Sequence, residues 1–233
     1  MDIRYRFLLA AGEACGFELR LDPGSLALAA PVLQPAPDWA RLGNHQCPRC
    51  PLDAAAHPLC PVARNLAGII HDFARRLSFE EGDIVISTGR RECRRRASLQ
   101  AGVSSLIGIV MVTSGCPILD QLRPMVYTHL PFASSEETAW RVISMYLTAQ
   151  HFRRRQGLAP DWDLAGLVRI YADVGLVNRH FVDRLRTVPM EDASLNAVVK
   201  LDCFATLTTA LIADRDLETF AALFQGWMGA SPA

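Results

Sequence analysis

Alternating apolar and polar residues open the chain and predict a β-hairpin. In DIRYRFLLA (2–10) and GFELRLD (16–22) nearly every second residue is apolar, which is the period of a strand with one buried face. DIVIST (83–88) and RECRRRASL (91–99) repeat this arrangement around a Gly-Arg turn. SLALAAPVL (25–33) predicts one further short strand.

Apolar residues spaced three and four apart dominate the rest of the chain and predict helices. The stretch from Ser98 to Gly115 is apolar nearly all round, with small Gly102 and Gly108, as in a central buried helix. Ser134 and Glu137 have the spacing of a capping box at the start of another helix. The pattern predicts helices over 62–77, 98–115, 134–157, 163–185, about 192–213 and about 215–228.

Two short strand pairs followed by long helices predict an α+β fold. We expect a small antiparallel sheet, built from the N-terminal strands and a mid-chain hairpin, packed on a larger multi-helix body. The chain is expected to form one domain over 1–233. Its parts are an N-terminal hairpin region at 1–38, a cysteine-rich metal loop at 39–62, and a helical body at 63–233 that contains the hairpin at 83–98.

Composition gives no general reason to expect nucleic acid or a membrane as a partner. The chain has 233 residues, of which 50% are hydrophobic, and a formal net charge of zero. No run approaches the roughly 18 consecutive apolar residues of a membrane-spanning helix, and the N-terminal apolar run is shorter than a secretory signal. We therefore expect a cytoplasmic protein whose seven cysteines stay reduced and serve metal, redox or packing roles.

Four of the seven cysteines directly precede proline, where fewer than one such pair is expected by chance. Proline is favoured at the first position of a helix, which places the preceding cysteine at the N-cap, where backbone N–H groups lower a thiol pKa. This interpretation suits Cys60 and Cys116 because amphipathic patterns follow both. Proline also stiffens metal-binding loops, and Cys47 and Cys50 have the CxxC spacing with which one turn gives two sulfurs to a metal.

The leading hypothesis is a metal centre formed by Cys47, Cys50, Cys60 and Cys116. Four thiolates suit zinc and an iron–sulfur cluster equally in ligand number. Pro51 departs from the usual zinc knuckle, which has glycine after the second cysteine, whereas Cys-Pro also ends the ligand run of bacterial ferredoxins. We expect zinc as the cofactor, with an iron–sulfur cluster as the alternative.

Other ligand sets and roles stay open at this stage. His57 could replace Cys116 and make the site wholly local, and His45 is a weaker candidate because it crowds the CxxC turn. His129, between two prolines, could approach Cys116 as a ligand or as a base, although a capping or surface role is the simpler interpretation. Cys47 and Cys50 could instead be a redox dithiol, or the cysteines could only pack.

Two further groups of polar residues have structural explanations that we favour. The arginine-rich strand at 90–96 sends its side chains to both faces and lacks interleaved aromatics, so nucleic-acid binding is disfavoured. Asn178, Asn196 and Asp202 interrupt apolar helix faces. They are expected to bond one another across a helix pair, with a pocket shared with Arg141 as the alternative.

The segments CPRCPL, CPVARNL, TSGCP and HLPFASSEET resemble an uncharacterised bacterial protein family without an established activity. The resemblance implies that Cys47, Cys50, Cys60, Cys116 and His129 occupy shared positions, and it favours Cys116 over His57 as the fourth ligand. It implies no reaction, so whether the protein is an enzyme stays open. No specific partner follows either, and a second copy or another protein could bind through the helical body.

Overall fold

Two hairpins that are distant in sequence pair into one antiparallel sheet. The computed structural model describes residues 1–9, 12–29, 35–89, 91–213 and 217–229. The strands run in the order β2-β1-β3-β4, so β1 pairs on both sides and Tyr5 lies opposite Phe17 and Ile86. Both predicted hairpins are confirmed. The strands are β1 (Asp2–Leu8), β2 (Ala14–Arg20), β3 (Glu81–Thr88) and β4 (Arg91–Ser98).

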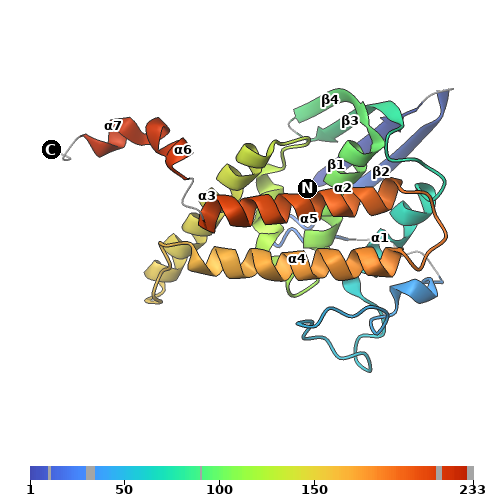
Figure 1. Ribbon diagram of the computed structural model, residues 1–233, viewed down its shortest axis with the longest axis horizontal. Helices are drawn as coiled ribbons and strands as arrows, with labels where there is room; N and C mark the ends of the chain where they lie inside the picture. Colours follow the sequence, from blue (N-terminus) through green and yellow to red (C-terminus); the bar gives the residue numbers. More distant parts are fainter. Residues whose placement is uncertain (10–11, 30–34, 90, 214–216, 230–233) are drawn as a thin grey trace.

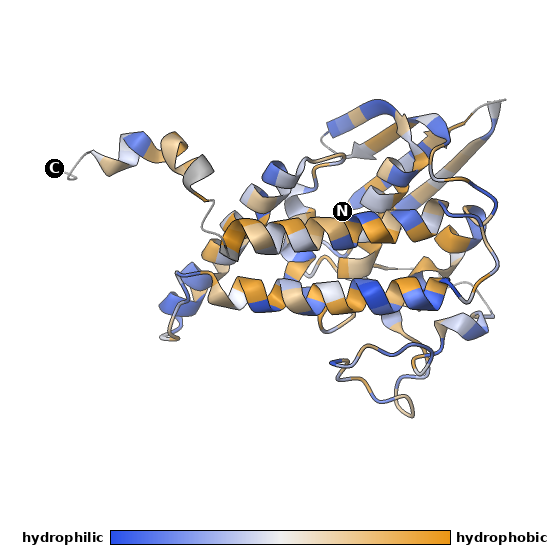
Figure 2. Ribbon diagram, viewed as in Figure 1, coloured by the Kyte–Doolittle hydropathy of each residue, from blue (hydrophilic) through white to orange (hydrophobic). Residues whose placement is uncertain are grey.

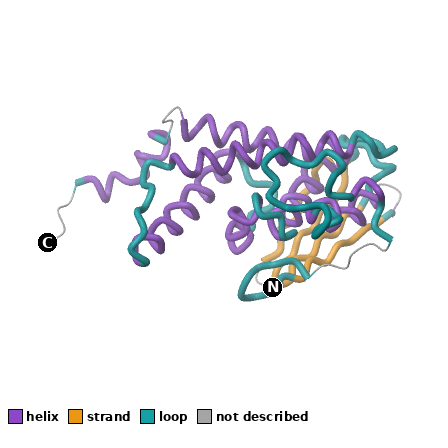
Figure 3. Tube along the Cα trace, turned by 90° about the horizontal axis from the view of Figure 1, so that it is seen from below, coloured by secondary structure: helices purple, strands orange, loops and turns teal. Residues whose placement is uncertain are grey.

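The sheet buries one face under the helices. Ile3, Tyr5 and Phe7 alternate with exposed residues along β1, as the period of a strand requires. Figure 3 shows the strands as one layer beside the helices, and Figure 2 shows β4 coloured largely hydrophilic at the edge. The architecture is therefore α+β, as the sequence predicts.

Five long helices form the second layer and share one hydrophobic core with the sheet. Figure 1 shows α4 and α5 running side by side, with α2 between them and the sheet, and α5 packs on both α4 and α2. The predicted capping box is confirmed, because the Ser134 hydroxyl accepts the Glu137 N–H while Glu137 accepts the Ser134 N–H. The helices are α1 (Pro61–Asp72), α2 (Leu99–Thr113), α3 (Ser135–Arg155), α4 (Ala165–Leu185) and α5 (Ala193–Ala213).

Gly102 lets α2 approach the sheet closely. A Cβ atom at this position would lie 2.5 Å from Ile84 Cδ1 and 2.7 Å from Phe7 Cε1. At Gly108, on the same helix, the nearest atom would be Leu201 Cδ2 at 3.4 Å, which is an ordinary contact. The small residues of the predicted central helix thus have different roles.

Several predicted boundaries are wrong. Within 25–33 the described residues form only an isolated bridge from Leu28 to Leu21, and 30–34 lie outside the described residues. The helix predicted over 215–228 is broken into short pieces, with 215–216 outside the described residues. Between the helices predicted over 98–115 and 134–157, the segment around Pro124 forms a 3₁₀ helix that was not predicted. The short elements are η2 (Asp38–Ala40), η3 (Leu119–Thr128), α6 (Glu218–Ala221), η4 (Ala222–Phe224) and α7 (Gln225–Met228).

Helix α5 has a high mean hydropathy, although charged residues interrupt its run of apolar residues. Over Ala193–Ile212 it is long and apolar enough to cross a membrane by length and composition, a test that core helices also pass. In the structure it packs on α2 and α4, and it carries Lys200 and Asp202. Only 28% of this stretch is buried, so packing covers part of its apolar surface and leaves Val199 and Leu207 exposed.

Candidate functional site

Four cysteines from separate segments border one small cavity beside α4. Cys47 and Cys50 belong to the loop between η2 and α1, Cys60 precedes α1, and Cys116 follows α2. The cavity has a volume of about 20 Å³, roughly the room that one water molecule needs. Helix α4 closes it with Val177, Phe181 and Arg184. The cysteines without a following proline, which are Cys15, Cys93 and Cys203, lie elsewhere.

Backbone hydrogen bonds fix the three cysteines of the loop. The Cys50 N–H donates to the Cys47 carbonyl at 2.9 Å and closes the CxxC turn. Cys60 is the N-cap of α1, with Pro61 as the first helical residue, so the predicted role of that proline is confirmed. The Cys60 N–H donates to the Ala40 carbonyl at 2.9 Å, which ties the end of the loop to its beginning.

Cys116 lies in a tight turn between α2 and η3. Gly115 adopts a φ of 86°, a left-handed conformation that glycine adopts without strain. The Cys116 N–H donates to the Ser114 hydroxyl at 3.3 Å, and its sulfur accepts the backbone N–H groups of Ile118 and Leu119. The prediction that Cys116 is a helix N-cap with Pro117 as the first helical residue is wrong, because η3 begins at Leu119 and its N-cap is Ile118.

Burial reverses the expected direction of the thiol pKa. Burial raises the pKa of Cys116, and the two backbone N–H groups that lower it do not compensate. Burial also raises the pKa of Cys47 to about 12, with further increases from Cys60, Cys116 and Cys50 and a decrease from Arg184. The prediction of a lowered pKa at Cys116 is wrong because desolvation outweighs the backbone N–H groups of Leu119 and Ile118.

Arg184 is a buried cation beside the cysteines that the sequence analysis missed. Its side chain is 2% exposed, and it donates to the carbonyls of Trp39 at 2.7 Å, Arg41 at 2.6 Å and Leu42 at 3.4 Å. Among the described residues no carboxylate is within ion-pair distance of it. Burial lowers its pKa, and Cys60, Cys47 and Cys50 raise it. The sequence could have indicated this burial, because Arg184 follows Phe181 by three residues and therefore lies on the same apolar face of α4.

The described residues do not form a finished metal site. No three His, Cys, Asp or Glu side chains in the described ranges form a group that could hold a metal ion as they lie. His45 borders the cysteine cavity, whereas His57 is exposed and does not. His129 does not border this cavity either, and its Nε2 lies 2.8 Å from the Tyr5 hydroxyl.

The arginine-rich strand β4 is engaged with neighbouring groups. Arg94 lies 3.7 Å from an Asp83 carboxylate oxygen, and Arg96 lies 3.3 Å from one of Glu81. The Arg95 guanidinium lies over the Phe132 ring, 5.7 Å from its centroid. These pairings support the interpretation of β4 as a solvated edge strand.

Asn178, Asn196 and Asp202 do not bond one another, contrary to our preferred expectation. Asn196 donates to the hydroxyl of Ser78 and to the carboxylate of Asp192, and Asp202 pairs with Arg179 at 3.6 Å. Asn178 instead borders a cavity together with Arg141, which was the alternative. The helices meet in a register that keeps the three side chains apart.

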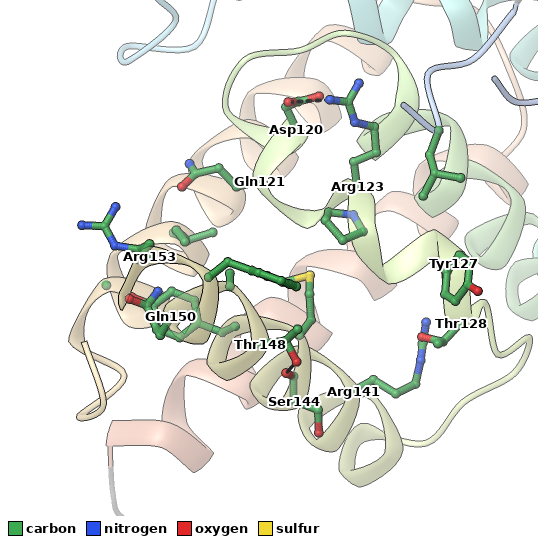
Figure 4. Close-up of a pocket in the computed structure, with 18 of the residues that line it drawn as sticks. Asp120, Gln121, Arg123, Tyr127, Thr128, Arg141, Ser144, Thr148, Gln150 and Arg153 are labelled. Atoms are coloured by element: carbon green, nitrogen blue, oxygen red, sulfur yellow. Dashed lines mark hydrogen bonds and ion pairs between the residues drawn. The ribbon is translucent and has the colours of Figure 1, made fainter. Parts of the chain in front are cut away.

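A wide groove of about 1460 Å³ lies between η3, α3 and α4. Figure 4 shows Asp120 and Arg123 on one wall and Arg141, Ser144 and Thr148 rising from α3. Arg123 pairs with Asp120 at 3.0 Å, so part of its charge is neutralised within the wall. The groove is open and mixed in charge, and it converges on no single reactive group.

Comparison with known proteins places the chain in a family. No curated protein and no solved structure is significantly similar to it. A family model, described as a domain of unknown function, matches nearly the whole length. The chain therefore belongs to the domain of unknown function family DUF6901, whose model matches residues 3–225.

Proposed function

We propose that the chain is a metal-binding protein in which Cys47, Cys50, Cys60 and Cys116 hold one structural zinc ion. The observation that carries the proposal is that these four cysteines border one cavity, whereas the other three do not. Sets of four thiolates are ligands of structural zinc sites. The proposal includes no reaction.

The charge of Arg184 supports an anionic centre at this place. A buried cation is costly unless an opposite charge lies near it. Four thiolates around a divalent ion carry a net charge of about −2, and the guanidinium would offset half of it. Neutral thiols would leave Arg184 with only carbonyl dipoles as partners. The proposal thus gives the buried cation a counter-charge.

Metal binding in this proposal requires the sulfurs to turn inward, because they form no ready metal group. The volume of the cavity suits a single ion. The CxxC turn lies in a largely exposed loop, so its side chains can change conformation when a metal binds. Cys116 lies 56 residues after Cys60. A shared ion would close this long loop and couple metal binding to folding.

The alternative function is a redox protein that uses the same cysteines. An iron–sulfur cluster needs more room than a cavity of about 20 Å³ offers, so the volume favours a single ion. A Cys47–Cys50 dithiol would need an accessible thiolate, and the burial of Cys47 weighs against this. Zinc therefore remains the first candidate.

The proposal extends to the family as an expectation about sequence. We infer that the four Cys-Pro dipeptides and the HLPFAS segment around His129 are shared by its members. An alignment of family members in which Cys116 varies freely while Cys47, Cys50 and Cys60 do not would contradict the inclusion of Cys116.

Elemental analysis of the full chain purified without oxygen tests the proposal. We expect about one zinc per chain in the wild type, a colourless solution, and loss of the metal in Cys47→Ser and Cys116→Ser. Visible absorption with stoichiometric iron would instead support the cluster. Metal content is measured together with circular dichroism so that metal loss and unfolding are separated.

Matched variants make the result specific. Cys203→Ser changes an exposed cysteine outside the cavity and should keep the full metal content. His57→Ala should also keep it. A wild-type protein without stoichiometric metal refutes the proposal, and full metal content in Cys116→Ser would indicate a local site that His57 completes.

A further inference from the structure

A second cavity, of about 200 Å³, lies within the helical layer between α2, η3, α3, α4 and α5. It shares no lining residue with the cysteine cavity. Its volume is just below the usual range of about 300–1,000 Å³ for ligand pockets, which suits a small ligand. Most of its wall is apolar, including Ile109, Val112, Leu122, Val126, Leu201 and Phe204.

Two polar side chains, Asn178 and Arg141, interrupt this wall. Asn178 is 2% exposed and lines the cavity. The Nε of Arg141 is buried without a partner, whereas its Nη2 donates to the Met125 carbonyl at 2.8 Å. Buried polar groups in native proteins are nearly always paired. A ligand with acceptor oxygens would pair with the Asn178 amide and with the guanidinium group of Arg141.

The charges around the cavity have one sign. Arg141 and Lys200 line it, and none of its described lining residues is an Asp or Glu. Burial, with a smaller contribution from Arg141, lowers the pKa of His129 to about 3, so its imidazole is neutral near pH 7. The polar end of the cavity therefore favours an anion.

Arg141 also borders the open groove, so it lies where the cavity meets solvent. Figure 4 shows its side chain reaching from α3 toward Thr128. A planar guanidinium pairs well with a carboxylate through two parallel hydrogen bonds. The rest of the wall is largely apolar apart from Lys200, whose Nζ lies 5.7 Å from the centroid of the Phe204 ring.

We propose that this cavity binds a small apolar monocarboxylate, with its carboxylate at Arg141 and Asn178 and its hydrocarbon part against the aliphatic wall. The proposal is independent of the cysteine centre. Octanoate is the probe, and 1-octanol, which has the same chain without the charge, is the matched control ligand.

Calorimetric titration of the full chain with both ligands tests the proposal. Octanoate should bind at least about tenfold more tightly than 1-octanol, because hydrogen bonds to charged groups contribute this much or more. Arg141→Met should weaken octanoate binding about tenfold and leave 1-octanol nearly unchanged. Asn178→Leu should fill the cavity and abolish binding of both.

Arg153→Met is the control for Arg141→Met, because Arg153 is an exposed residue of α3 that lines the groove but not the cavity. It should leave octanoate binding unchanged. Arg141→Lys, which keeps the charge, should retain a preference for octanoate if Arg141→Met does not fold. Equal affinity of the wild type for both ligands, or no saturable octanoate binding, overturns the proposal.

Discussion

Replacing Arg184 by methionine tests whether a buried cation holds the cysteine loop on α4. The change keeps an unbranched apolar stem, shortens the side chain, and removes three hydrogen bonds, of 2.7, 2.6 and 3.4 Å, to the carbonyls of Trp39, Arg41 and Leu42. The Trp39 carbonyl retains a bond from Asn44, so it is not left unpaired.

The expected cost follows from the two short bonds. Each hydrogen bond from a charged group contributes about 1.5–3 kcal/mol, and the bond at 3.4 Å contributes little. We therefore expect Arg184→Met to lower the free energy of unfolding by about 3–5 kcal/mol in metal-loaded protein. In metal-free protein the cost should be smaller, because the cation then loses the anionic centre that offsets its burial.

Urea denaturation followed by circular dichroism measures this difference. The control is Arg186→Met, two residues further on, where an exposed arginine pairs with Asp183 at 2.8 Å. Such exposed pairs contribute about 0–1 kcal/mol. If Arg184→Met is no more destabilising than Arg186→Met, the buried guanidinium does not hold the loop. Equal costs with and without metal would refute its electrostatic link to the centre.

Two further predictions concern the core. Gly102→Ala should lower the free energy of unfolding by about 1–3 kcal/mol more than Gly108→Ala does, because only the first places a methyl group 2.5 Å from Ile84 Cδ1. Equal urea midpoints for the two variants would contradict the close approach of α2 to the sheet. The pKa of His129 is lowered to about 3 in the folded protein, so on acidification the imidazole is protonated in the unfolded chain before it is protonated in the folded one. The free energy of unfolding should therefore fall as the pH drops from about 6.5 toward 3, by up to about 1.4 kcal/mol per pH unit. His129→Gln should reduce this slope in urea titrations between pH 7 and 5, and an unchanged slope would refute a neutral buried imidazole.

Helices and strands were predicted well wherever the pattern depends only on residues close together in the sequence. The alternation around Tyr5 defined β1, and the Ser134–Glu137 spacing defined the start of α3. Cys60-Pro61 likewise identified the start of α1. These features depend on backbone geometry over one turn or one strand, so no knowledge of distant contacts was needed.

The features that the sequence did not predict depend on contacts between residues far apart in the chain. The pairing of His129 with Tyr5 joins residues 124 positions apart, and no local pattern distinguishes it from an approach to Cys116. The pKa of Cys116 depends on how deeply the turn is buried, which its proline does not encode. In the short pieces after α5, Phe220 and Phe224 pack on Trp140 of α3, a contact that the local apolar pattern did not indicate.

Arg184, which is buried, and Arg141, which is half-buried, could not be distinguished from other arginines in the sequence. On a predicted helix both resemble the exposed arginines around them, and only the structure shows each beside a cavity with no ion pair to a carboxylate of the described residues. Helix α4 lies between the two, since Val177 borders the cysteine cavity and the next residue, Asn178, borders the other. A buried cation without a fixed counter-ion is unfavourable in the folded chain alone. We propose on this ground that both cavities accept an anionic partner, a metal–thiolate centre at one and a carboxylate at the other.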